Sequence, residues 1–312
     1  MFSIKFRRIA SGVAAAVVIP LVLPAAANAA PPTYRLVDLG IGDDSVAVAI
    51  NDRGHVVGTR ADGGAFLWRD GRTTDLGAFT PTDVNNLDEV SGFRPTETGI
   101  QAVLWRHGVR TDLATSPGGS SAAFAVSDRG QVVGWSAAPE GVMHATSWQR
   151  GVPTSLSDEV SFASDVNDRG QVVGAAGSLN QVAVRWFRGD ETQLSAEPTQ
   201  ATAVNRPGTV TGLVFGGSTA GFVWQHGRFI DLPAPPGEPI FSFTQPTGIN
   251  SRTQVVGTSS DGAFVWERGR TTILPGLTPA AAANDINELG VIAGSNPTTP
   301  DGLVPHAVIW RK

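Results

Sequence analysis

Three aspartates share one position in a repeated phrase and could together bind a cation or a polar ligand. Asp83, Asp165 and Asp285 each stand two residues before the Asn of a recurring turn, where the other copies hold Ala or Gly. On inner strands of a ring these carboxylates would line a central channel. A buried carboxylate needs hydrogen-bond partners, so the alternative is that each one accepts hydrogen bonds from neighbouring backbone.

A second set of residues lies in segments of unequal length and could bind a glycan or another small molecule. The candidate ligand-binding residues are Trp135, Glu140, His144, Phe241, Asp301 and His306. An aromatic ring beside carboxylates can stack on a sugar ring or on an apolar ligand group. The alternatives are structural, because Trp135 could simply cover the end of its strands. His144 and His306 occupy a position that three other copies fill with the small residues Gly or Ala.

Motifs of catalysis are absent from the sequence. It contains no Gly-x-Ser-x-Gly, no His-Glu-x-x-His, no phosphate-binding glycine loop and no EF-hand loop. The Asp-x-Gly phrases lack the aromatic residue that completes the Asp-box of sialidases. We therefore expect no catalytic residue, no metal and no cofactor.

The elements that must position these residues come from a repeat of about forty residues in seven copies. Each copy has an anchor residue that follows a Val or Ile, and then a Trp 16 to 23 residues later. The anchors are Asn51, Asn85, Ser127, Asn167, Asn205, Asn250 and Asn287. The Trp residues are Trp68, Trp105, Trp148, Trp186, Trp224, Trp266 and Trp310.

Turn signals divide each copy into four short strands. Asn51-Asp52-Arg53-Gly54 fits a type I turn followed by a left-handed residue, and Asp70-Gly71 fits a two-residue hairpin. In the fourth turn position Asp88 is compatible with this geometry, whereas Thr253 predicts a distorted turn in the sixth copy. Four antiparallel strands, A to D, joined as a meander are typical of a propeller blade. The sequence therefore predicts an all-β, seven-bladed β-propeller.

The chain ends predict how the ring closes. The last copy stops at its C strand on Trp310, and residues 34–40 resemble the D strand at residues 72–77. We expect residues 34–40 to complete the last blade, and Trp310 to be less buried than the other six repeat Trp residues. An open solenoid, the alternative, would need distinct capping repeats. The predicted domain spans residues 30–312, with repeats at about 41–80, 81–120, 121–160, 161–198, 199–243, 244–280 and 281–312.

A meander sorts the connections onto two sides of the ring. The A–B and C–D turns lie on one side, called here the turn face, and are short and uniform. The B–C loops and D–A links lie on the other side, called here the loop face, and vary in length. Variable loops on a repetitive scaffold are where repeat proteins usually bind, so the sequence predicts a ligand site on the loop face.

The N-terminal segment predicts export. Lys5, Arg7 and Arg8 precede an apolar stretch, and Ala27-Asn28-Ala29 is a small-x-small cleavage signal. We expect residues 1–29 to be a signal peptide cleaved near Ala29–Ala30, by the general or the twin-arginine route, leaving a secreted monomer without a membrane anchor.

The charge composition of the expected mature chain argues against some classes of partner. Residues 1–29 carry 3 of the 23 Lys and Arg residues and none of the 28 Asp and Glu residues, so the remaining net charge is −8. This charge argues against nucleic acid and anionic membranes as partners. With no Cys, the fold has to be stabilised by burial and topology.

The repeat resembles a known family. Gly64-Ala65-Phe66-Leu67-Trp68, Gly262-Ala263-Phe264-Val265-Trp266, His144-Ala145 and His306-Ala307, with the Ile-Asn-x-x-Gly-x-Val-Val-Gly phrase, are similar to the HAF repeat of bacterial proteins. Only two copies keep the His of the motif. The resemblance implies an extracellular repeat protein and implies no reaction.

Two classes of function remain. The first is a secreted binding or scaffold module without chemistry of its own, whose extracellular ligand is a glycan, a small molecule or a protein. The alternative is a secreted propeller enzyme, a hydrolase or lyase acting on a glycan or metabolite in an axial pocket. Only analogy with other propellers supports the enzyme.

Overall fold

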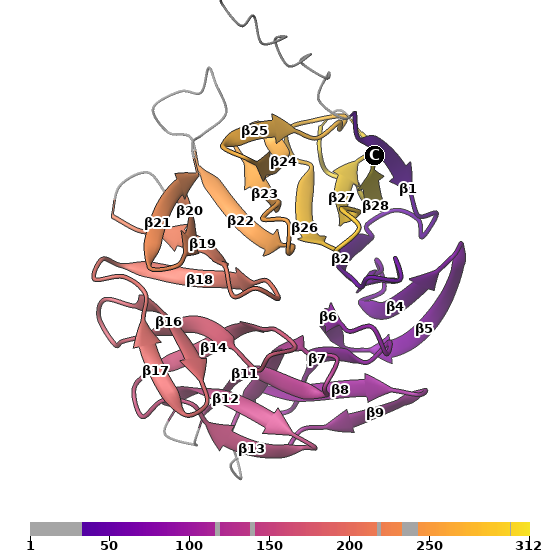
Figure 1. Cartoon of the computed structure of the whole chain (residues 1–312). Helices are drawn as coiled ribbons and strands as arrows, with labels where there is room; N and C mark the ends of the chain where they lie inside the picture. Colours follow the sequence, from indigo (N-terminus) through magenta and orange to yellow (C-terminus); the bar gives the residue numbers. More distant parts are fainter. Residues whose placement is uncertain (1–32, 116–118, 138–140, 217–219, 233–242, 300) are drawn as a thin grey trace, which may run out of the picture. The chain divides into compact units, whose positions relative to one another are not determined.

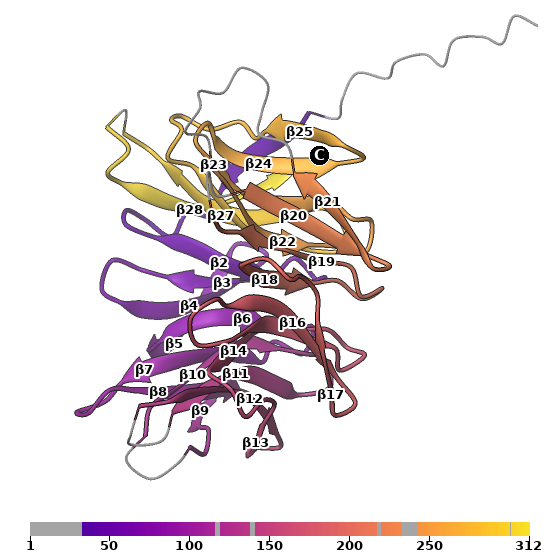
Figure 2. The same ribbon diagram turned by 90° about the vertical axis from the view of Figure 1, so that its left-hand side faces the viewer.

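Seven four-stranded antiparallel sheets make up the part of the chain that folds as one unit, residues 33–312, in a computed structural model. The structure describes these residues except 116–118, 138–140, 217–219, 233–242 and 300. The sheets are arranged as blades around a common centre (Figure 1), and Figure 2 shows the same blades after a turn of 90°. The predicted seven-bladed β-propeller is confirmed.

Each blade contributes one strand to each of four positions. The innermost A strands are β2 (Val46–Ile50), β6 (Thr80–Val84), β10 (Ser121–Val126), β14 (Ser161–Val166), β18 (Thr199–Val204), β22 (Thr244–Ile249) and β26 (Ala282–Ile286). The B strands are β3 (Val56–Thr59), β7 (Val90–Pro95), β11 (Gln131–Ala137), β15 (Val172–Ala176), β19 (Val210–Val214), β23 (Val255–Ser259) and β27 (Ile292–Pro297). The C strands are β4 (Gly64–Arg69), β8 (Ile100–Arg106), β12 (Met143–Gln149), β16 (Val182–Phe187), β20 (Ala220–Gln225), β24 (Gly262–Glu267) and β28 (Pro305–Arg311). The D strands are β5 (Arg72–Ala78), β9 (Val109–Asp112), β13 (Val152–Ser155), β17 (Asp190–Gln193), β21 (Arg228–Leu232), β25 (Arg270–Ile273) and β1 (Arg35–Asp38).

The N-terminal strand closes the ring. Blade 1 starts with β2, and blade 7 has the order β1-β28-β27-β26, so its D strand comes from the other end of the chain. Strand β1 pairs with β28 in the register Leu36 opposite Trp310, and Leu39 N donates to Ala307 O at 3.0 Å. The pairing of residues 34–40 with the last C strand is therefore confirmed.

Seven apolar clusters, one in each gap between neighbouring blades, form the core. Strand alternation sends successive side chains to opposite faces of a sheet. In blade 1, Ala65 and Leu67 pack toward blade 2, whereas Phe66 and Trp68 pack toward blade 7. Each blade is thus held on both sides, and burial is spread evenly around the ring.

The repeat Trp residues are buried in five blades and half-buried in two. Trp148 and Trp310 are fully buried, whereas Trp68 and Trp224 keep some exposure. The expectation that Trp310 would be less buried is wrong, because β1 lies over it and its Nε1 donates to Pro275 O at 2.7 Å.

We expect replacement of Trp148 by Ala to destabilise the fold strongly. Trp148 is fully buried, and its Nε1 donates to Ala114 O at 2.7 Å. Truncation of a buried Trp costs about 3–5 kcal/mol, which urea unfolding of the purified chain measures. The control is Val152→Ala in the next strand, which removes an exposed side chain. Equal loss in both variants would contradict this packing.

The turns contain residues whose backbone lies in the left-handed region, with positive φ. In blade 1 Gly54 has φ +79°, and the hairpin residues Asp70 and Gly71 have φ +46° and +80°. Thr253 adopts φ +59° in the equivalent turn of blade 6, and its N donates to Asn250 O at 2.9 Å, as Gly54 N does to Asn51 O. The predicted distortion is therefore wrong: the Thr accepts a strained backbone angle and the turn keeps its shape.

A bulge in every A strand explains the recurring glycine of the B strand. The pairing register shifts near the end of each A strand, between Ala47 and Ala49 in blade 1. A Cβ on Gly58 of the partner strand would overlap the carbonyl oxygen of Val46. Each A strand is also the inner edge strand of its sheet, so backbone N–H groups that do not bond to the B strand are available at the axis, as Ile50 N is for Asp285 Oδ2.

Candidate functional site

The three aspartates of the repeat lie at the axis and bond to backbone on two blades each. Asp83 Oδ1 accepts from Val84 N of its own blade at 2.7 Å, and its Oδ2 accepts from Val126 N of blade 3 at 2.8 Å. Asp165 bonds in the same way to blades 4 and 5, and Asp285 to blades 7 and 1. Both oxygens of each carboxylate therefore already accept a hydrogen bond from a backbone N–H of an inner strand.

The two hydrogen bonds of each carboxylate explain where in the ring the aspartates occur. Each one serves its own blade and the next, so three aspartates serve six blades and need never be neighbours. The one blade that no aspartate serves is blade 6. It has Gly248 at this position, and a Cβ there would lie 3.1 Å from Asp285 Oδ1. Small residues at the alternate positions leave room for the neighbouring carboxylate.

Burial gives the three carboxyl groups raised pKa values. Removal from water, and secondly the charge of Asp285, raise the pKa of Asp83 to about 8. Burial also raises the pKa of Asp165 and of Asp285 to about 6 each, against the hydrogen bonds from backbone N–H groups, which lower them. Folding therefore shifts the protonation equilibrium of all three groups toward the neutral carboxyl.

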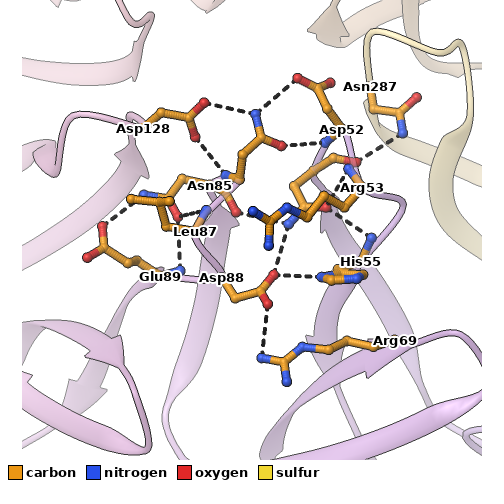
Figure 3. A network of polar contacts seen from close by, with 12 residues as sticks. Asp52, Arg53, His55, Arg69, Asn85, Leu87, Asp88, Glu89, Asp128 and Asn287 are labelled. Atoms are coloured by element: carbon orange, nitrogen blue, oxygen red, sulfur yellow. Dashed lines mark hydrogen bonds and ion pairs between the residues drawn. The ribbon is translucent and has the colours of Figure 1, made fainter.

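A ring of asparagines lies on the turn-face side of the carboxylates. Each Asn anchor donates from Nδ2 to the backbone oxygen of the next blade's anchor, as Asn51 does to Asn85 O at 2.9 Å and Asn287 does to Asn51 O at 3.0 Å. The chain of bonds is interrupted where Ser127 replaces Asn, between blades 3 and 4. These anchors therefore join blades to one another, and Figure 3 shows this network at blades 1 and 2.

The residues that follow the anchors form a second ring of contacts at the channel mouth. Asp128 Oδ1 accepts from Asn86 N at 2.7 Å, Asp168 Oδ1 from Asp128 N at 2.9 Å, and Asp52 Oδ1 from Glu288 N at 2.9 Å. These acidic side chains thus bind backbone of the adjacent blade and are already engaged.

Two cavities occupy the axis, one on each side of the carboxylates. The turn-face cavity is about 240 Å³ and is lined by the anchors and the residues after them. The loop-face cavity is about 140 Å³ and is lined by A-strand residues such as Thr82, Phe124 and Asn284. Asp83 lines both. Asp165 and Asp285, the other two predicted channel carboxylates, line the loop-face cavity.

The structure does not bring the loop-face candidates together into one of its described cavities. Glu140 and Phe241 lie outside the described residues. Trp135 lies half-buried on β11, opposite Ala122 and Ala145. Asp301 is exposed and accepts from Leu303 N at 3.2 Å within its own loop.

The two histidines form hydrogen bonds to the D–A links that follow their own blades. His144 Nδ1 lies 3.1 Å from Glu159 O in the link that follows its blade. His306 lies between Asp38 Oδ2, at 2.7 Å from Nδ1, and Asp43 Oδ1, at 2.8 Å from Nε2. The hydrogen bond to Asp38 is the main cause that raises the His306 pKa. His306 therefore bonds to the segment that closes the ring.

Within the described residues, no group of three or more Asp, Glu or His side chains could hold a metal ion. The same residues contain no helix long and apolar enough to cross a membrane.

Basic side chains gather on the turn face, which sequence reasoning missed. The exposed arginines at the A–B and C–D turns are Arg35, Arg53, Arg72, Arg106, Arg129, Arg150, Arg169, Arg188, Arg206, Arg228, Arg252, Arg268, Arg270 and Arg311. None of them has an ion-pair partner among the described residues. On the loop face Arg60 and Arg94 are both paired, with Asp75 and Asp112 for example. The sequence feature that indicates this basic surface is the frequent arginine at the A–B and C–D turns, because the meander places all of these turns on one face.

Comparison with known proteins supports the fold alone. No protein-family profile and no curated protein matches the chain. Among solved structures, the β-propeller domain of the Trilobed protease from Pyrococcus furiosus has a TM-score of 0.54 at 8% identity, with 86% of this chain and 94% of that chain covered. YCF48, solved with a D1 peptide bound, has a TM-score of 0.52 at 12% identity, with 90% of this chain and 96% of that chain covered.

Proposed function

We propose that this chain is an exported binding module without chemistry of its own. The observation that supports it most is the use of the channel carboxylates. A general acid or base must reach the reacting proton of a substrate, yet both oxygens of Asp83, Asp165 and Asp285 accept backbone hydrogen bonds. The groups best placed for axial catalysis therefore act in the scaffold.

The turn face is the better candidate for the binding surface. It carries unpaired arginines and the wider axial cavity, whereas the described loop-face candidates His144, His306 and Asp301 bond within the fold. Ligand sites combine concavity with a few convergent polar groups. A glycan or another small molecule remains the proposed ligand class, and the peptide seen on YCF48 makes peptides a sensible second library.

One screen separates the binding module from the enzyme. The chain from Ala30 to Lys312 is applied to a glycan array and incubated with a panel of hydrolase and lyase substrates. We expect retention of at least one glycan class and no turnover. A triple variant combines Asp83→Ala, Asp165→Ala and Asp285→Ala, and Ala is the natural residue at this position in three other blades. Turnover that disappears in the triple variant would establish the axial enzyme instead. Turnover that survives the triple variant would also exclude the proposal.

A further inference from the structure

A pocket on the turn face lies between blades 2 and 3, away from the axis. Its volume is about 350 Å³, within the range of small-ligand sites. Its floor is apolar and buried, with Leu104, Leu113 and Trp148. Exposed Arg106, Arg129 and Arg150 lie around it. The pocket therefore combines an apolar floor with three cationic groups.

The cationic groups of this pocket are free, whereas its acidic groups are engaged. No hydrogen bond or ion pair of the described residues involves the guanidinium of Arg106, Arg129 or Arg150. Glu89 Oε2 accepts from Asn85 Nδ2 at 2.8 Å, and both oxygens of Asp128 accept from Asn86. The lining has three arginines against two carboxylates, so its formal charge is net positive, and its unpaired donors are guanidinium N–H groups, which suit an anion.

In the neighbouring gap between blades 1 and 2, the equivalent arginine is paired with a carboxylate. There Asp88 lies 3.1 Å from Arg69 Nη2 and 2.7 Å from His55 Nδ1 (Figure 3). Arg106 is the equivalent of Arg69, and Gly130 stands where Asp88 would supply the carboxylate. In the gap between blades 2 and 3 the nearby carboxylate belongs to Glu89, whose Oε2 lies 3.9 Å from where a Cβ on Gly130 would stand. Among the described residues Glu89 forms no ion pair with Arg106, so this arginine lacks the pairing that Arg69 has.

We propose that this pocket binds an acidic sugar. This inference rests on the proposed binding function and names the ligand class. The carboxylate, sulfate or phosphate of the sugar pairs with Arg106, Arg129 and Arg150, for which planar guanidinium groups are well suited. The C–H faces of the ring pack over Leu104 and Leu113. The exposed side chains of Thr111 and Gln149 in the lining offer hydrogen bonds to hydroxyls.

Titration calorimetry with single sugars tests the pocket. The probes are glucuronate, glucose 6-sulfate, glucose 6-phosphate, neutral glucose and inorganic sulfate. We expect at least one acidic sugar to bind at least tenfold more tightly than glucose and than sulfate, and the best of the three identifies the acidic group. Binding of sulfate as tight as that of the sugars would reduce the pocket to a plain anion site and overturn the proposal, as would the absence of millimolar binding by all three acidic sugars.

Matched substitutions distinguish the pocket from the general charge of the face. Arg150→Gln and Arg129→Gln remove charges at the pocket, whereas Arg268→Gln and Arg169→Gln remove exposed arginines from the same turn positions of other blades. All four side chains are exposed, so all four variants should fold, which their thermal melts check. We expect at least tenfold weaker binding in the first pair and less than twofold change in the second. Equal losses in both pairs would overturn the proposal.

Failure here and failure of the binding function give different results. If another glycan class binds on the array and no acidic sugar binds in the pocket, the pocket assignment is wrong and the binding module stands. If a substrate is turned over, the binding module itself is wrong.

Discussion

Raising the pH from 4 to 8 lowers the free energy of unfolding of this chain, and Asp83 is the main cause. In the folded ring the Asp83 pKa is raised to about 8, from an ordinary value of 3.8. Between these two values the folded chain binds a proton that the unfolded chain has released, so stability falls as the pH rises. One such proton corresponds to about 1.4 kcal/mol per pH unit. The loss is complete above the folded pKa and absent below the unfolded one.

Asp165 and Asp285 add to this effect with the same sign. Their pKa values are raised to about 6, so their share of the loss falls between pH 4 and pH 6. Buried carboxyl groups whose pKa is raised in the fold make a chain less stable as the pH rises, the opposite of the usual ion-paired carboxylate.

The variant Asp83→Asn isolates the contribution of this group. The amide cannot ionise, but its NH₂ group cannot accept the hydrogen bond that one carboxylate oxygen took. We expect Asp83→Asn to be less stable than the unaltered chain at pH 5, and the difference to shrink or reverse by pH 9. Urea unfolding across this pH range measures it, with the exposed turn residue Asp70→Asn as the control. Parallel pH profiles for the unaltered chain and Asp83→Asn would contradict the assignment.

Removal of the closing strand should cost nearly as much. A chain that begins at Ile41 lacks the buried Tyr34 and Leu39 and the half-buried Leu36, and it uncovers Trp310. Each large apolar side chain contributes roughly 1.5–3 kcal/mol by burial, so we expect a loss of about 5 kcal/mol or more. For a domain of this size that lowers the midpoint of thermal unfolding by roughly 10–20 °C. The freed edge of β28 would also favour aggregation.

A chain that begins at Thr33 is the matched control, because it keeps all of β1 (Arg35–Asp38). Its melting temperature should equal that of a chain beginning at Ala30. If the chain from Ile41 melts at this temperature as well, the N-terminal strand does not hold the ring together.

The fold was predictable because its signals repeat. One Asn-x-x-Gly turn is weak, but seven anchors in register with seven Trp residues define the blade length. The D-like segment at residues 34–40 then has only one free edge to join, that of β28. The misjudged burial of Trp310 is set by a strand far away in the sequence, which covers it. The turn at Thr253 keeps its shape because Asn250 Oδ1 accepts hydrogen bonds from Arg252 N and Gln254 N.

The site was less predictable, for physical reasons. The sequence predicted that Asp83, Asp165 and Asp285 line the channel, but each one bonds to backbone of its own blade and of the next blade. Which N–H groups of two blades come together is set by the packing of the ring. Loop length directed attention to Trp135 and the loop face. At the pocket between blades 2 and 3, Gly130 stands where Asp88 pairs with Arg69 in the neighbouring gap. The sequence shows only an ordinary turn glycine there, so it gives no sign that Arg106 is unpaired.

The most direct test of the account is one glycan array read with three proteins: the unaltered chain, Arg150→Gln on the turn face and Trp135→Ala on the loop face. The account predicts that glycans with acidic sugars are retained by the unaltered chain and by Trp135→Ala, and that Arg150→Gln loses them. Retention by Arg150→Gln together with loss in Trp135→Ala would place the ligand on the loop face and contradict the account.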